Sequence, residues 1–333
     1  FDCMSPPMTT LYVDRRSTAL KLDGEALAFY EDDARIGTVP LAPLDRVVLR
    51  GEVTLQSNVL GKLGAMGIGV VVLSGRKSEA TLLLPQPHAD AARRLTQFHL
   101  AQDSAFCLAF AQQVLTEKLT AQRDVLLSLV PTRLFARQTL TACAAQLDSG
   151  LQSLLQQPHV AGLRGVEGAA ASQYFAGLVA ALPAALGFTG RNRRPPRDPF
   201  NAVLSLAYTL LQADAVQTLY VGGLDPYVGF LHGVSYGRES LACDVIEPLR
   251  PLVDSWLVGC FAEGTLRIED FSTTASGCLL GKAGRVRFYS AYEAACVPWR
   301  RALTQATYAL VNTLKAHGLP TMPQARDPMT AED

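Results

Sequence analysis

The chain has 333 residues, of which 49% are hydrophobic and 18% charged, and its thirty basic and thirty acidic side chains leave no net formal charge. This composition excludes a disordered or fibrous chain and is typical of a globular protein of about two domains. The balanced charge excludes binding to a polyanion through bulk positive charge, so such binding would need basic residues gathered in one place.

The cysteine spacing and the hydropathy pattern indicate the cellular compartment. The seven cysteines are scattered and never spaced as C-x-x-C, which argues against a disulfide framework and a structural zinc site. The chain contains no run of 18 apolar residues and no signal-like N-terminus. We therefore expect reduced, mostly buried thiols, no membrane partner and a cytoplasmic location.

The N-terminal part follows the two-residue period of β-strands. Residues 1–7 precede Met8, which reads as a natural start, and we interpret them as a tag, a linker or a fusion remnant. In ALKLDGEALAFY (19–30) the apolar residues alternate on both sides of Asp23-Gly24, which predicts a hairpin. Further strands are predicted at LYV, RVVLRG, IGVVVLSG and EATLLLP. The run GKLGAMGIGVVVLSG is not a nucleotide-binding loop, because its glycines precede the strand.

The period changes to that of helices after residue 85. Residues 86–317 carry apolar side chains at helical spacing, and the polar, proline-containing residues 318–333 are expected to form a flexible tail. The sequence thus predicts an α+β protein with a β-rich N-terminal domain at residues 8–85 and a larger, all-helical C-terminal domain.

The first candidate for chemistry is Glu167 in GVEGAAASQYFAGLVAALPAAL. On a helix it would share the apolar face with Tyr174 and Leu178. An unpaired carboxylate facing a core costs several kcal/mol, so Glu167 should have a cation partner, either a metal ion or an arginine. The alternative places Glu167 in the first helical turn, where it complements the helix dipole. Both interpretations stay open on this segment alone.

The second candidate is LDPYVGFLHGVSYGRESLACDVIEPLRP (224–251). Asp244 and Glu247 lie three residues apart, on one side of a helical turn. A structural interpretation makes them a capping box with Asp244 as the N-cap, which suits Pro248 but not Pro251. On the same interpretation, His232 is a hydrogen-bonded core residue.

A functional interpretation joins these residues. One imidazole with two or three carboxylates suits Mg²⁺ or Mn²⁺. Such a metal ion polarises a phosphoryl oxygen and activates a hydroxyl or water for in-line attack. Glu167, His232, Asp244 and Glu247 together therefore indicate phosphodiester chemistry.

The third candidate is the loop that opens RNRRPPRDPFNAVLSLAYTLL. Its arginines form a local positive patch in a neutral chain, suited to phosphate contacts: Arg191, Arg193, Arg194 and Arg197. A merely solvated surface is the alternative. Arg238 and Arg250 would extend the patch, although Arg250 could equally neutralise Glu247.

These motifs resemble the CRISPR-associated protein one family, the integrases of spacer acquisition in antiviral defence. The resemblance rests on VEG-x6-F near Glu167, on the two long segments quoted above and on TTASGCLLGKAGRVRFYSAYE, in the family's order from Met8 to about His317. It implies an N-terminal homodimerisation domain and a helical catalytic domain with a metal site. It also implies DNA integration, in which protospacer 3′-hydroxyls attack the CRISPR repeat, and metal-dependent DNA endonuclease activity.

The resemblance also assigns residues and partners. The family's metal ligands correspond to Glu167, His232 and Glu247, with Mg²⁺ or Mn²⁺ as the cofactor, and Asp244 corresponds to a further acidic position of the catalytic set. CRISPR-associated protein two would bridge two homodimers, and some members carry a fused or associated reverse transcriptase or nuclease domain. A non-catalytic DNA-binding scaffold, in which only the arginines matter, is the alternative function. A hydrolase using His232 is weaker, since no nucleophile elbow accompanies it.

Overall fold

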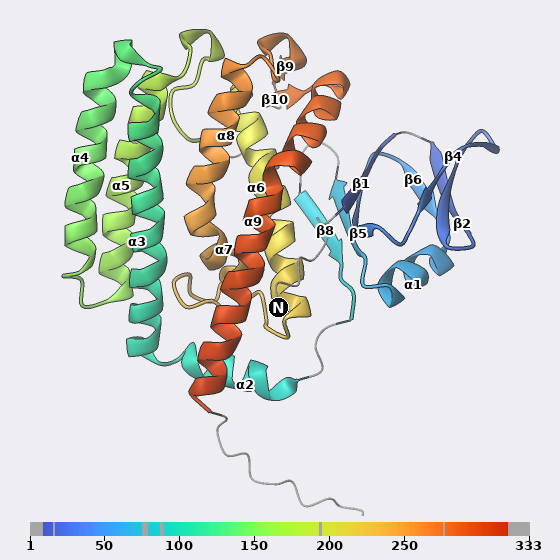
Figure 1. Cartoon of the computed structure of the whole chain (residues 1–333), viewed down its shortest axis with the longest axis horizontal. Helices are drawn as coiled ribbons and strands as arrows, with labels where there is room; N and C mark the ends of the chain where they lie inside the picture. The colour runs from blue at the N-terminus through green and yellow to red at the C-terminus, as the bar shows by residue number, and fades with distance from the viewer. Residues whose placement is uncertain are drawn as a thin grey trace, which may run out of the picture.

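The computed structural model describes residues 9–15, 17–74, 79–86, 90–192, 195–275 and 277–318. The predictions for residues 1–7 and for the tail beyond Gly318 lie outside this part of the chain. The described residues form a β-rich N-terminal region beside a helical region (Figure 1).

Two four-stranded sheets and one helix make up the N-terminal region. The first sheet has the order β1 (Thr9–Asp14), β5 (Leu44–Arg50), β7 (Gly69–Ser74) and β8 (Glu79–Leu83). Its first three strands are parallel and β8 is antiparallel to β7. The second sheet has the order β4 (Ala34–Pro40), β3 (Ala26–Glu31), β2 (Thr18–Asp23) and β6 (Val53–Leu55). Helix α1 (Ser57–Ala65) leads into β7.

The predicted hairpin is confirmed as β2 and β3. Leu20 pairs with Phe29 and Leu22 with Leu27, and Gly24 supplies the positive φ of 59° that the tight turn needs. The sequence did not predict β4, because this strand is almost entirely exposed and lacks the alternation of buried apolar side chains.

The first sheet packs on both of its faces. Val13, Val47 and Val70 belong to the core shared with the second sheet and α1, whereas Val48 and Val71 belong to the core of the helical region. Successive residues of a strand point to opposite faces. The sheet is therefore buried between the second sheet and the helices, and it connects the two regions through its side chains.

The helical region holds the long helices α2 (Ala91–Leu100), α3 (Ser104–Leu129), α4 (Arg137–Leu154), α5 (Val160–Ala181), α6 (Pro199–Val221), α8 (Arg250–Ala262) and α9 (Lys282–Ala316). Short helical turns are η1 (Leu134–Ala136), η2 (Ala184–Leu186), α7 (Ser240–Ile246), η3 (Glu247–Leu249) and η4 (Ile268–Asp270). Helices α3, α4 and α5 stand side by side, and α6, α8 and α9 lie between them and the sheets (Figure 1). No helix in the described ranges is long and apolar enough to cross a membrane.

One element corrects the prediction of an all-helical C-terminal domain. Strands β9 (Phe271–Thr274) and β10 (Gly277–Leu280) form an antiparallel hairpin between α8 and α9. Cys278 anchors it, since its amide donates to the carbonyl of Pro196 at 2.7 Å and its side chain is buried. Strands of four residues are too short to interrupt a helical period visibly. The observed fold is thus α+β, with a helical part that contains this small sheet.

The expected state of the cysteines is confirmed where the structure describes them. Six cysteines are free, and four of these are buried: Cys143, Cys260, Cys278 and Cys296. Cys3 lies outside the described residues.

A buried ion cluster joins the sheets to the helices. Asp214 on α6 pairs with Arg46 on β5 and, at 3.0 Å, with Arg300 on α9. Arg300 also pairs with Glu293 at 2.8 Å. The three central side chains are at most 5% exposed. Asp214 is therefore the carboxylate that two buried guanidinium groups share across the boundary between the two regions.

We expect Asp214→Ala to lower the free energy of unfolding by about 3–5 kcal/mol, because it leaves two buried arginines without their shared counter-charge. Chemical denaturation measures the effect. Asp23→Ala is the matched control, since it removes an exposed pair with Arg35 that contributes less than about 1 kcal/mol. Equal effects of the two substitutions would contradict this account of the cluster.

Candidate metal and nucleic-acid site

Two of the predicted ligands meet at one buried ammonium group. Lys118 on α3 places its Nζ 2.5 Å from Glu167 Oε1 and 2.6 Å from Glu247 Oε2. The Lys118 and Glu247 side chains are 7% and 8% exposed, and Glu167 is 28% exposed. Glu167 and Glu247, which are eighty residues apart in the sequence, thus share one cation.

Glu167 lies well inside α5, so the alternative that placed it in the first helical turn is wrong. Its face of α5 is the buried one, since Tyr174 and Leu178 are completely buried. The burial argument correctly required a cation partner. The partner in the structure is a lysine from another helix rather than an arginine.

Two prolines shape the segment that carries the acidic pair. Pro248 lies in the first turn of η3 and Pro251 in the first turn of α8. A proline has no N–H to continue a preceding helix but fits the first turn of a new one. The chain therefore breaks into α7, η3 and α8, and Glu247 lies at the first break, facing α3.

The capping-box interpretation of the acidic pair is wrong. Asp244 lies inside α7, whose N-cap is Glu239, and Glu247 begins η3. Asp244 is completely buried. A carboxylate in that position needs hydrogen-bond donors, and these come from the loop before α7.

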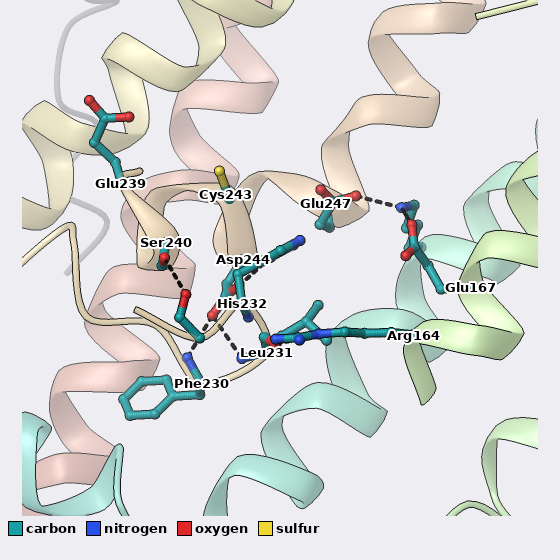
Figure 2. A network of polar contacts seen from close by, with 12 residues as sticks. Arg164, Glu167, Phe230, Leu231, His232, Glu239, Ser240, Cys243, Asp244 and Glu247 are labelled. Carbon is teal, nitrogen blue, oxygen red and sulfur yellow. Dashed lines mark hydrogen bonds and ion pairs between the residues drawn. The ribbon is translucent and has the colours of Figure 1, made fainter. Parts of the chain in front are cut away.

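Asp244 holds the loop that carries His232. Its Oδ2 accepts from the amides of Phe230 at 2.7 Å and Leu231 at 3.0 Å, and its Oδ1 accepts from the amide of His232 at 2.9 Å. Oδ1 also lies 2.7 Å from His232 Nδ1 (Figure 2). With Nδ1–H donated to Asp244, the imidazole keeps Nε2 as its free lone pair.

Gly229 allows the close approach between this loop and α7. A Cβ atom there would lie 2.7 Å from Asp244 Oδ2 and 2.8 Å from the carbonyl oxygen of His232. Two other side chains fix the same loop. Gln97, fully buried on α2, donates to the carbonyl of Val228 at 2.7 Å, and Arg164 on α5 donates to the carbonyl of Leu231 at 3.1 Å.

The charges around Glu247 keep it ionised. Burial by itself raises the pKa of Glu247, but Arg250 and Lys118 outweigh it, with a smaller contribution from His232, and lower the pKa to about 2. Burial likewise opposes the charge of Lys118, yet Glu247 and Glu167 raise its pKa. Glu247 is therefore negatively charged at neutral pH, and this charge lies near the imidazole.

Arg250 neutralises Glu247, as one of the two interpretations proposed. Its Nε lies 3.0 Å from Glu247 Oε1, and its guanidinium group lies 4.6 Å from the ring centre of Tyr208. Tyr208 donates to Asp254 at 2.5 Å. Burial raises the pKa of Asp254 to about 6, although Tyr208, Tyr174 and the arginines oppose this shift.

The remaining arginines of the predicted patch differ in exposure. Arg191 points inward and donates to Asn201 Oδ1 at 2.8 Å and Ser205 Oγ at 3.2 Å, whereas Arg197 and Arg238 are exposed. Arg193 and Arg194 lie outside the described residues. Of the described arginines of the predicted patch, Arg197 and Arg238 are thus the ones that face solvent.

The donor set fits a hard divalent cation in its chemistry. It offers two carboxylates and one imidazole whose other nitrogen is held by a buried aspartate, a common support of metal-binding histidines. Glu247 Oε2 is shielded from solvent and lies at ion-pair distance from Lys118 without an aligned hydrogen bond. Among the described residues, however, no three His, Cys, Asp or Glu side chains are preassembled around one point. Lys118 stands between the two carboxylates.

Known proteins are similar to this chain in sequence or in fold. A family model described as CRISPR associated protein Cas1 matches residues 11–294. CRISPR-associated endonuclease Cas1 1 of Thermodesulfovibrio yellowstonii is 37% identical over 296 residues, covering 86% of this chain and 91% of that protein. A casposase bound to integration product has a TM-score of 0.81 at 20% identity, covering 93% of this chain and 91% of that chain. A Cas6-RT-Cas1–Cas2 complex has a TM-score of 0.79 at 24% identity, covering 94% of this chain and 35% of that chain.

Fold and site together define an α+β protein whose helical part gathers two carboxylates and an imidazole beside a buried ammonium group. The family match spans most of the chain, and the relative from Thermodesulfovibrio exceeds 30% identity over most of both proteins. The chain belongs to the Cas1 family. The two solved structures support the fold.

Sequence reasoning missed the residues that support the site. Lys118 occurs in an ordinary amphipathic helix, and only the packing of α3 against α5 and η3 buries it. Gln97 has no distinguishing neighbours in the sequence. Gly229 carried a weak signal, since a glycine beside a candidate ligand often marks a close backbone approach.

The low pKa of Glu247 makes stability depend on pH. Its folded-state pKa of about 2 lies below the ordinary value of 4.5, so its contribution is complete above the unfolded pKa and is lost as pH falls. Between pH 6 and pH 3, with a chelator present, the unfolding free energy should fall by about 2 kcal/mol more in the wild type than in Glu247→Gln. Denaturation curves at each pH measure this difference, and parallel pH profiles would contradict it.

Proposed function

We propose that this chain is a divalent-metal-dependent DNA endonuclease and integrase of CRISPR spacer acquisition. One observation carries the proposal: Glu167 and Glu247 meet at a single cation position near His232, whose Nδ1 is held by Asp244. The endonuclease name of the Thermodesulfovibrio relative and the casposase bound to integration product support the same chemistry.

The residues of the site have different roles. Glu167 and Glu247 supply carboxylate oxygens and His232 supplies Nε2 as ligands, while Asp244 fixes the ring and its tautomer. Mg²⁺ or Mn²⁺, when bound, polarises a phosphoryl oxygen and activates the 3′-hydroxyl or a water for attack. Arg250 stabilises the ionised form of Glu247. Asp244 is thus a positioning residue rather than a ligand.

Substrate and partners follow from the exposed charge and from the similar proteins. We infer that Arg197 and Arg238 contact DNA phosphates of the protospacer and the CRISPR repeat, since both are exposed on the helical part. The Cas6-RT-Cas1–Cas2 complex supports the proposal that a Cas2 protein bridges two homodimers of this chain. A dimer contact through residues 8–85 is part of the same proposal.

Glu167→Ala, His232→Ala and Glu247→Ala should each reduce strand transfer by about a thousandfold or more, because each removes a metal ligand. The assay joins a 3′-hydroxyl oligonucleotide to a repeat-bearing plasmid in the presence of a Cas2 protein and Mn²⁺. Glu25→Ala is the matched control, since it removes a mostly exposed glutamate that pairs with Lys62. Strand transfer at the wild-type rate in all three site variants would contradict the proposal.

A non-catalytic DNA-binding scaffold is the second candidate, and Lys118 is the observation that favours it, because its ammonium already pairs with both site carboxylates. A scaffold would bind DNA in a salt-dependent manner, as phosphate contacts require. It would show no change of melting temperature with Mn²⁺. A Mn²⁺-dependent rise that His232→Ala abolishes would exclude the scaffold, since a ligand stabilises the state that binds it.

A further inference from the structure

We propose that Lys118 is a positioning residue that occupies the cation position of the metal-free site and leaves this position when Mg²⁺ or Mn²⁺ binds. The inference rests on the proposed function, because it assumes that Glu167 and Glu247 are metal ligands. It adds a role for a side chain of α3 that lies among these ligands without being one of them.

The geometry supports such an exchange. Lys118 Nζ is almost equally distant from the two carboxylates, at 2.5 Å from Glu167 and 2.6 Å from Glu247. A Mg²⁺ ion held by these two carboxylates would need their oxygens at a shorter distance, about 2.0–2.1 Å. The ammonium and the metal ion therefore compete for the same carboxylate oxygens.

The charges favour exchange over addition. In the metal-free site, Lys118 and Arg250 balance the charges of Glu167 and Glu247. The Asp244 carboxylate beside His232 adds one negative charge. A divalent cation added to this set would leave one uncompensated positive charge in a largely buried region, which is unfavourable. Departure of the ammonium removes that charge and the repulsion at the shared oxygens.

Of the two cations that contact Glu247, Lys118 rather than Arg250 is the one that can move away. Arg250 is held against the Tyr208 ring, 4.6 Å from its centre, and forms an ion pair with the Glu247 oxygen that Lys118 does not contact. A lysine side chain instead carries a compact charge on a flexible four-carbon stem. Glu167, one of its two partners, is 28% exposed, so this side of the ion pair reaches solvent. Figure 2 shows the Glu167 and Glu247 side chains pointing toward each other.

The exchange gives the metal-free protein a stable resting arrangement. Without a cation, the two carboxylates would repel each other in a site where Glu247 is buried. With Lys118 between them, the helices that carry the ligands stay packed in place. The metal ion then finds its ligands gathered, but it must compete with the ammonium group.

Lys118→Met tests the exchange, because methionine keeps a long, flexible side chain and removes the charge. Melting temperature is measured with a chelator and then during Mn²⁺ titration. We expect the variant to melt lower than the wild type without metal, and to reach its half-maximal Mn²⁺ response at a concentration roughly tenfold lower, since the competing cation is gone. Lys62→Met is the matched control, because it removes the exposed pair with Glu25 and should leave the Mn²⁺ response unchanged.

The possible outcomes separate this inference from the proposed function. An unchanged or weaker Mn²⁺ response in Lys118→Met, beside a wild-type response that His232→Ala abolishes, overturns the exchange and leaves the metal site standing. Absence of any Mn²⁺ response in all proteins contradicts both. If Lys118→Met does not fold without metal, Lys118→Gln serves in its place, since its amide keeps a hydrogen-bond donor for the carboxylates.

A second measurement needs no variant. In the wild type with a chelator, an amine-reactive ester should modify Lys118 slowly. The Lys118 side chain is only 7% exposed, and its ammonium group is paired with two carboxylates. Saturating Mn²⁺ should speed this modification several-fold and leave that of Lys62 unchanged, as peptide mass spectrometry would show. Slower or unchanged modification of Lys118 with Mn²⁺ overturns the exchange.

Discussion

The buried ion pairs around Glu247 are the interaction on which the functional site depends. A carboxylate that is 8% exposed stays charged only because Lys118 and Arg250 approach its two oxygens. The same ammonium brings Glu167 from α5 to this position. Charge compensation thus joins α3, α5, η3 and α8 at one point, and the site requires these helices to be packed as they are.

The backbone around this point fixes the position of the His232 imidazole. Pro248 and Pro251 divide the chain into α7, η3 and α8, which turns Asp244 inward and Glu247 toward α3. Asp244 then satisfies three consecutive amides of the loop 230–232 and His232 Nδ1. A buried carboxylate with this many donors is fixed in place. The histidine ring is fixed with it, so its remaining nitrogen has a defined direction.

The sequence predicted what depends on local period and on the cost of burial. The hairpin of β2 and β3 was predictable because the side chains alternate across a turn, and a cation partner for Glu167 was predictable because an unpaired buried carboxylate is too costly. The identity of that partner was not, since Lys118 becomes buried only when α3 packs on α5. Asp-x-x-Glu occurs at helix starts and inside helices alike, so Asp244 could not be placed from its pattern.

The family resemblance went further than local pattern for the site, because it named residues from distant segments. It brought Glu167 together with Glu247, and the structure places both at the ammonium of Lys118. It could not distinguish arginines that face solvent from Arg191 and Arg250, which bond to neighbouring side chains of the protein. That distinction depends on the packing of α6 against α8 around Tyr208.

The central claim is that Glu167, His232 and Glu247 form one cation site. Crystals of the protein grown with Mn²⁺ and measured near the manganese absorption edge test it most directly. The account predicts one anomalous peak bonded to Glu167, Glu247 and His232 Nε2, with Asp244 still bonded to His232 Nδ1. A peak elsewhere, or no peak while Lys118 stays between the two carboxylates at saturating Mn²⁺, would contradict it.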